Sequence, residues 1–278
     1  MEAISTADDR AGKAYWDTAW GEEEWPPDID PRASRIWAHR DQVLHREIQR
    51  ILERAAPPHR STALSVLELG CARSAWLPYF AREFGCRVAG LDYSELGARQ
   101  AAERLETLGI PGEVRCADLF APPADWIGAF DVVAWFGVAE HFENTTQAIA
   151  AAARYLRPGG TLITEVPNLA GLNGWLQRVL HKPVYDIHVP LTAADLARFH
   201  EAAGLEIVSS RYLVPTDFGV IDLAGHPPGL WRDLKDRTLY PLRLLSGAVW
   251  WIDRRYGPIP TSRVTSGFVM TAARAPLA

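Results

Sequence analysis

The feature that most constrains this chain is an alternation of strand-like runs with helical patterns between about residues 63 and 214. Short runs suited to strands follow one another, and stretches of helical character separate them. The runs are residues 64–69, 87–91, 112–116, 130–135 and 161–166. Strands that alternate with helices in this way are typical of a parallel sheet with helices packed against it. The pattern therefore predicts an α/β fold.

Residues able to cap a helix mark the expected helix starts between these runs. Their side-chain oxygens can accept hydrogen bonds from the free backbone N–H groups of a first turn. The predicted caps are Ser74, Ser94, the pair Asn144 and Gln147, and the pair Thr192 and Asp195. We expect the last of these helices to end at Gly204 in a left-handed conformation.

Two further strands are predicted, at residues 205–208 and 266–272. The Pro- and Gly-rich residues 215–261 between them are far longer than an ordinary connection of ~4 to 6 residues, and such insertions are usually lids or binding elements. We expect a non-helical excursion, after which the final strand pairs antiparallel with its predecessor. Residues 239–252 are apolar enough to contact a membrane surface, but Arg243 interrupts them and a buried helix is the favoured interpretation.

The first 60 residues predict a helical cover that packs on the sheet domain. A helix is expected to begin with Asp30 as its N-cap and Pro31 at its first position. Apolar residues then recur at helical spacing up to Pro57 and Pro58, which would end the helix.

Composition narrows the function classes. The 278 residues are 48% hydrophobic and 23% charged, as in a folded globular protein, and the formal net charge of -5 argues against nucleic acid as a partner. Cys71, Cys86 and Cys116 form no metal-binding or disulfide pattern, so we expect no metal site and a reducing cytoplasm. No export signal and no membrane span of ~18 to 20 apolar residues is expected.

A thin loop follows the first predicted strand. Gly70 can adopt a positive φ and lets a ligand approach the backbone, while Ala72 keeps the loop narrow. A strand that runs through such a turn into a helix offers backbone N–H groups to a nucleotide-sized ligand. The glycine pattern of a dinucleotide site is absent, which disfavours an NAD-dependent oxidoreductase.

Three carboxylates stand at the ends of successive strands: Glu68, Asp92 and Asp118. Asp92 follows Gly70 by 22 positions, close to the roughly 20 expected for an acid that binds ribose hydroxyls. Because the carboxyl ends of parallel strands line one crevice, we expect the three acids around a bound nucleoside, with Asp118 near an adenine amine.

From residue 63 to residue 208 the chain resembles the class I S-adenosylmethionine-dependent methyltransferases. The motifs that carry the resemblance occur in family order at residues 66–72, 91–94, 117–119, 130–133, 140–142 and 156–162. The family usually has glycine where this chain has Ala72 and Ser74. The resemblance implies a Rossmann-like seven-stranded mixed sheet, with its last strand antiparallel and helices on both faces. It also implies a methyltransferase domain over residues 61–278, with substrate-covering insertions at about 168–191 and 215–261.

The resemblance implies S-adenosylmethionine as cofactor and S-adenosylhomocysteine as product. It implies cofactor contacts from Tyr15, Glu68, Gly70, Cys71, Ala72, Asp92, Tyr93, Ala117, Asp118, Leu119, Phe136 and Gly137. His141 and His188, on loops at the carboxyl edge of the sheet, are the candidate bases, and Glu140 is expected to orient the substrate.

The function predicted is methyl transfer to a small molecule, foremost O-methylation of an apolar or aromatic metabolite. N- or C-methylation of a small metabolite, sugar or lipid-like acceptor, and a non-catalytic cofactor-binding relative, remain alternatives. A nucleic-acid substrate is disfavoured because the fourth strand lacks an N-P-P-Y-type motif and no basic stripe occurs. Monomer and homodimer are both compatible with the sequence.

Overall fold

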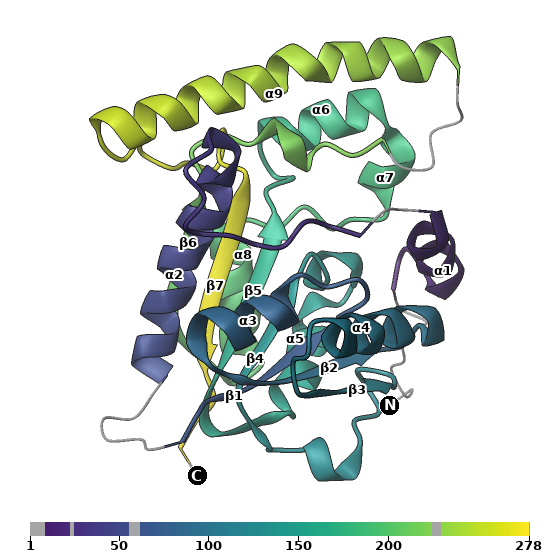
Figure 1. The fold of residues 1–278 in the computed structure, drawn as a ribbon, viewed down its shortest axis with the longest axis vertical. Coiled ribbons are helices and arrows are strands. Elements are labelled where there is room, and N and C mark those ends of the chain that lie inside the picture. Colours follow the sequence, from purple (N-terminus) through teal and green to yellow (C-terminus); the bar gives the residue numbers. More distant parts are fainter. Residues whose placement is uncertain (1–8, 23–24, 56–61, 224–228, 278) are drawn as a thin grey trace.

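A seven-stranded sheet forms the centre of the computed structural model, which describes residues 9–22, 25–55, 62–223 and 229–277. The strand order is β3-β2-β1-β4-β5-β7-β6, and β7 is antiparallel to both of its neighbours (Figure 1). The strands are β1 (Ser65–Leu69), β2 (Arg87–Asp92), β3 (Gly112–Cys116), β4 (Phe130–Phe136), β5 (Leu156–Pro167), β6 (Glu206–Leu213) and β7 (Phe268–Arg274). The predicted mixed sheet and its antiparallel last strand are confirmed.

Helices cover both faces of the sheet. One core holds residues of α5 (Thr145–Ala153) and α8 (Ala193–Ala202), and the other holds residues of α2 (His39–Ala55), α3 (Trp76–Phe84) and α4 (Glu95–Thr107). Neighbouring strand residues enter opposite cores because side chains alternate along a strand. The strands at the centre are therefore apolar on both faces, which is why they could be found in the sequence.

The predicted helix caps are observed. Ser94 accepts a hydrogen bond from the backbone N–H of Gly97 at 3.1 Å, and Asn144 accepts one from that of Gln147 at 3.2 Å. Thr192 and Asp195 form a reciprocal capping box at the start of α8, and Gly204 follows that helix with φ of +83°. Ser74 accepts a hydrogen bond from the backbone N–H of Trp76 at 2.8 Å.

The predicted helix start at Pro31 is wrong. Asp30 accepts a hydrogen bond from the backbone N–H of Arg32 at 2.9 Å, which stabilises a turn instead of a helix. Regular structure begins with a 3₁₀ turn, η2 (Ile36–Ala38), and continues as α2. A separate short helix, α1 (Lys13–Glu22), lies beside α4 (Figure 1). The prolines expected to end α2 lie outside the described residues.

The expected non-helical excursion is also wrong. After a 3₁₀ turn, η5 (Phe218–Val220), residues Leu230–Tyr256 form α9, a helix of 27 residues that continues through Pro241. It lies at one end of the molecule next to α6 (Leu172–Leu180), which α7 (Lys182–Asp186) follows (Figure 1). Leu239 and Leu242 pack against apolar residues of α6.

Only one side of α9 is buried. The side chains of Leu244, Leu245 and Trp251 remain 47%, 50% and 55% exposed, so a buried helix at residues 239–252 is only half correct. Among the described residues, no helix is long and apolar enough to span a membrane.

Candidate active site

The loop after β1 passes very close to the loop after β4. Gly70 has φ of +71°, and a Cβ placed on it would lie 2.6 Å from a methyl carbon of Val138. Any larger residue would therefore be strained and would clash with the loop after β4. The loop's second left-handed residue is Arg73, with φ of 50°, although the family's glycines were expected at the positions of Ala72 and Ser74.

Asp92 and Glu68 hold this loop in place. Asp92 accepts hydrogen bonds from the backbone N–H of Ala72 at 2.9 Å and of Ser94 at 2.8 Å. Glu68 accepts one from the Ser74 hydroxyl at 2.6 Å. Burial raises the pKa of Asp92 to about 6 and that of Glu68 to about 8, the latter with a contribution from the charge of Asp92.

A cavity of about 480 Å³ lies over these carboxylates, within the usual range for small-ligand sites. Most of the predicted cofactor residues line it. They are Glu68, Gly70, Ala72, Asp92, Tyr93, Ala117, Leu119, Phe136 and Gly137. The structure thus brings together the ends of β1, β2, β3 and β4, as parallel strands allow.

Three predicted cofactor residues do not line this first cavity. Cys71 is fully buried beneath the loop, where its sulfur would lie 2.6 Å from a Cβ on Gly90. Asp118 accepts a hydrogen bond from the backbone N–H of Phe120 at 2.8 Å and stabilises a turn. Tyr15 lines a second cavity instead. These contacts remain predictions for a bound state.

The N-terminal segment also contributes residues to the first cavity, among them Asp9, which the sequence analysis missed. Asp9 accepts hydrogen bonds from the Tyr93 hydroxyl at 2.6 Å and from the indole N–H of Trp16 at 3.0 Å. Trp16 and Trp20 stack with ring centroids 5.3 Å apart, and both line the cavity. The clustered tryptophans were a usable signal, whereas nothing in the sequence marked Asp9.

A second cavity, of about 490 Å³, adjoins the first. Acidic side chains and one arginine are among its lining residues: Asp28, Asp41, Glu140, Glu165, Asp222 and Arg40. The two cavities share Trp16, Pro26, Ala75, Trp76, Phe136, Gly137 and His141. His141 therefore lies where they meet.

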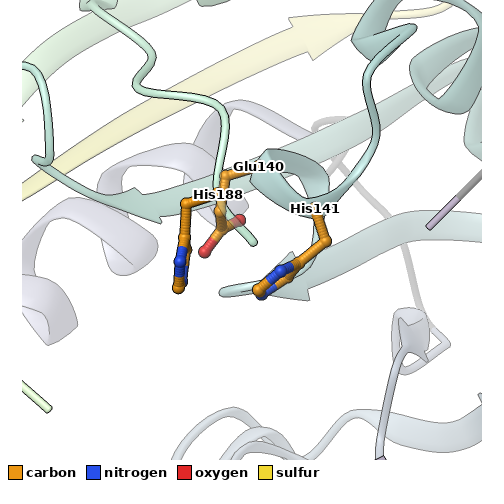
Figure 2. Close-up of side chains that lie close together, drawn as sticks. All are labelled: Glu140, His141 and His188. Atoms are coloured by element: carbon orange, nitrogen blue, oxygen red, sulfur yellow. The ribbon is translucent and has the colours of Figure 1, made fainter. Parts of the chain in front are cut away.

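Glu140, His141 and His188 lie close together on the wall of the second cavity (Figure 2). Glu140 and His141 belong to a 3₁₀ turn, η4 (Ala139–His141), and His188 follows α7. The imidazole centroids are 4.5 Å apart. Burial lowers the pKa of both histidines, that of His141 to about 4, and raises the pKa of Glu140.

Backbone carbonyls determine the tautomers of both rings. His141 Nδ1 lies 3.0 Å from the carbonyl oxygen of Ile187, and His188 Nδ1 lies 2.5 Å from that of Val184. A carbonyl only accepts hydrogen bonds, so each Nδ1 carries the proton and each Nε2 of the neutral ring keeps its lone pair. The arrangement can accept protons or ligate a cation.

The fold and the first cavity define an α/β protein that binds a nucleoside-type ligand at the carboxyl ends of its strands. A sequence model of the methyltransferase domain matches residues 36–210, which is more than half of the chain. The chain belongs to this methyltransferase domain family.

Curated relatives agree with this assignment. A probable S-adenosylmethionine-dependent methyltransferase of Mycobacterium tuberculosis is 31% identical over 145 residues, which cover 51% of this chain and 46% of the relative. A ubiquinone biosynthesis O-methyltransferase of Thiobacillus denitrificans is 30% identical over 151 residues, which cover 51% of this chain and 64% of the relative. The chain thus spans about half to two thirds of the length of these relatives.

Solved structures share the fold. A putative sarcosine dimethylglycine methyltransferase from Galdieria sulphuraria has a TM-score of 0.62 at 13% identity, covering 97% of this chain and 98% of that one. A Haemonchus contortus phosphoethanolamine N-methyltransferase with S-adenosylmethionine has a TM-score of 0.57 at 17% identity, covering 98% and 60%. The predicted class, an S-adenosylmethionine-dependent methyltransferase, is confirmed at the level of the family.

The first cavity fits this cofactor. Glu68 and Asp92 both line it while buried, with pKa values raised because nothing cationic offsets their burial sufficiently. The sulfonium and ammonium groups of S-adenosylmethionine are positive and would favour the ionised carboxylates. Leu91, Leu119 and Phe142 add apolar surface to this cavity.

Proposed function

We propose that the protein transfers a methyl group from S-adenosylmethionine to a small-molecule acceptor held in the second cavity, foremost by O-methylation of an apolar or aromatic metabolite. The observation that carries the proposal is the shared wall of the two cavities, at which His141, Trp76 and Phe136 face both. Reacting groups from the two cavities can meet there, and close positioning accounts for much of the rate of such a transfer.

The chain's own residues have distinct roles in this proposal. Asp92 accepts the ribose hydroxyls, and Glu68 favours the cationic end of the cofactor. Asp118, if the turn that holds it rearranges, accepts from the adenine amine. When bound, the cofactor supplies an electrophilic methyl group attached to a sulfonium.

Glu140, His141 and His188 orient the acceptor and remove its proton. An acceptor hydroxyl held there would lie beside the cofactor site, and the cofactor would supply its methyl group to that oxygen. His141 takes the hydroxyl proton, with His188 as the alternative base, and Glu140 orients the acceptor. The neutral state of both imidazoles leaves a lone pair available for that proton.

A second candidate is N-methylation. Five acidic side chains but a single arginine line the second cavity, which favours an acceptor with an ammonium group over an anionic one. Buried Glu165 is notable among them, because its Oε1 has no hydrogen-bond partner and its pKa is raised to about 8 by burial. An amine or hydroxyl donor would satisfy this oxygen.

The test combines binding with turnover. Calorimetry should show S-adenosylhomocysteine bound in preference to NADH, and methyl-labelled S-adenosylmethionine should label either phenolic or amine acceptors from a mixed panel. Preference for NADH would contradict the proposal. Cofactor binding without labelling of any acceptor would instead favour a non-catalytic relative.

The remaining expectations stay predictions. Cys71, Cys86 and Cys116 are free thiols in the described structure, and the cytoplasmic location is still to be tested. The division into a cover at residues 1–60 and a methyltransferase domain at 61–278, and a monomeric or homodimeric state, are to be tested on the full chain.

A further inference from the structure

We propose that Glu140, His141 and His188 form a binding site for a divalent transition-metal ion on the acceptor side of the crevice. One ligand-capable atom from each residue lies within 4.8 Å of the other two (Figure 2). Two imidazoles and one carboxylate are the donor set of many zinc and non-haem iron sites. The ion's binding does not depend on the proposed function, but its use in catalysis rests on it.

The carboxylate of Glu140 lacks a partner that its burial requires. The side chain is 2% exposed, and its Oε2 makes no hydrogen bond in the described structure. No ion pair joins it to a lysine or arginine within the described residues. A buried charge is costly unless it is paired or ligates a metal, so a cation at this point would offset that cost.

The histidines are already oriented as metal ligands. Ligating histidines almost always donate their other ring N–H to a carbonyl or carboxylate, which fixes the tautomer. Here the carbonyls of Ile187 and Val184 accept from Nδ1 of His141 and His188, so Nε2 is the unprotonated atom in both.

The two segments that carry the ligands are also joined to each other. The backbone N–H of Val189, next to His188, donates to the carbonyl oxygen of Glu140 at 2.6 Å. Arg10 donates to the carbonyl oxygen of His188 at 2.8 Å. The spacing of the three ligands is thus set by backbone contacts and not by the side chains alone.

The site would remain open to an acceptor. All three residues line the second cavity, and three protein ligands leave at least one coordination position free. A hydroxyl that occupies this position loses its proton more easily because the ion carries positive charge. Ligation uses the same lone pairs as base catalysis, so with an ion bound the acidification comes from the ion and not from an imidazole.

The donor set also predicts which ions bind. Imidazole ligands favour Zn²⁺, Fe²⁺ and Co²⁺, whereas Mg²⁺ and Ca²⁺ prefer an all-oxygen environment. We therefore expect Co²⁺ and Zn²⁺ to bind, with Mg²⁺ far weaker.

The experiment is a titration of untagged, chelator-treated full chain with Co²⁺ and Zn²⁺, without cofactor or acceptor. We expect one equivalent of either ion by calorimetry and visible absorption of low-symmetry Co²⁺. His188→Ala and the nearly isosteric Glu140→Gln should each weaken binding by at least 10-fold. The control His45→Ala removes an imidazole that contacts Tyr79, outside the site, and should bind as the parent does.

Absence of one-equivalent binding in the parent chain would overturn the inference, as would equal affinity in Glu140→Gln, His188→Ala and His45→Ala. Thermal melting without metal shows whether each variant folds, and Glu140→Gln keeps the test valid if His188→Ala does not. S-adenosylhomocysteine binding and methyl transfer by the metal-free protein test the proposed function separately. If the metal-free protein neither binds S-adenosylhomocysteine nor transfers a methyl group, the proposed function fails, and the metal titration still tests the metal site by itself.

Discussion

The cofactor side and the acceptor side of the crevice are built differently. The first cavity is formed largely by residues that directly follow β1, β2, β3 and β4, and backbone groups shape its loop. The second draws on α2, α6, α7 and the loops that precede them, and on segments far apart in the chain. The difference teaches that a shared sheet edge can hold the cofactor, whereas in the proposed function inserted segments would select the acceptor.

The largest effect is expected at His141, which lies where the two cavities meet. His141→Ala should slow single-turnover methyl transfer by at least ~100-fold, because a general base or an ion ligand is lost. Its affinity for S-adenosylhomocysteine should stay within about two-fold, since the cofactor carboxylates are untouched. His45→Ala is the control, and a few-fold loss of rate or less in His141→Ala would show that the imidazole is not needed.

The second prediction concerns how the free energy of unfolding depends on pH through His200, a residue outside both cavities. Burial lowers the pKa of His200 to about 4, and its Nε2 lies 2.8 Å from the hydroxyl of Thr164. Its Nδ1 lies 2.7 Å from the carbonyl of Leu196, so Nε2 accepts from Thr164. The unfolded value is near 6.5, so the folded state binds fewer protons between pH 6.5 and 4. The stability that neutral His200 contributes to the folded state is therefore fully present above pH 6.5 and is lost as the pH falls toward 4.

The loss attributable to His200 should reach about 2 to 3 kcal/mol near pH 4. Urea unfolding of the parent chain and of His200→Asn across this range measures it. The difference between their unfolding free energies should shrink as the pH falls. A difference that does not change with pH would show that His200 is not the titrating group.

The third prediction concerns the cofactor side alone. Asp92→Asn should weaken S-adenosylhomocysteine by about 1 to 3 kcal/mol, because an acceptor for the ribose hydroxyls is impaired. Calorimetry measures the change, and Asp125→Asn is the matched control because Asp125 is exposed and pairs with Arg115. Unchanged affinity in Asp92→Asn would place the ribose elsewhere.

The smallest effect is expected in the N-terminal segment and in the segment that contains α9. Hydrogen exchange of residues 9–22 and 229–261 should slow together by about five-fold, or ~1 kcal/mol, when cofactor and acceptor are bound. Closure over ligands would exclude water from the reacting groups. Amides of β4 serve as the internal reference. Equal exchange with and without ligands would make these segments passive packing.

Sequence patterns predicted the sheet because its signals are local. Central strands such as β1 and β4 are mostly apolar, and caps such as Ser94 act within one turn. The edge strand β6 was predicted too short because Ser209, Ser210 and Arg211 interrupt its apolar pattern. Its extension depends on pairing with β7, which the sequence does not display.

The N-terminal segment and α9 were harder to predict because their structure depends on distant contacts. The full length of α9 was not predicted, because Pro241 and the glycines near its ends suggested an irregular segment around a helix at residues 239–252, although packing of Leu239 and Leu242 on α6 stabilises the longer helix. Similarly, Asp9 reaches the cofactor cavity through a hydrogen bond to Tyr93, 84 positions away. Such pairings leave no mark in a single sequence.

The N-terminal segment has a kinetic consequence. Asp9 bonds to Tyr93 beside the first cavity, while Arg10 bonds to the carbonyl of His188 beside the second. Lifting residues 9–10 therefore breaks contacts on both sides in a single event. If both ligands pass through this opening, the cofactor and the acceptor exchange in one opening step. Release of the product from the second cavity would then also expose the first cavity to solvent.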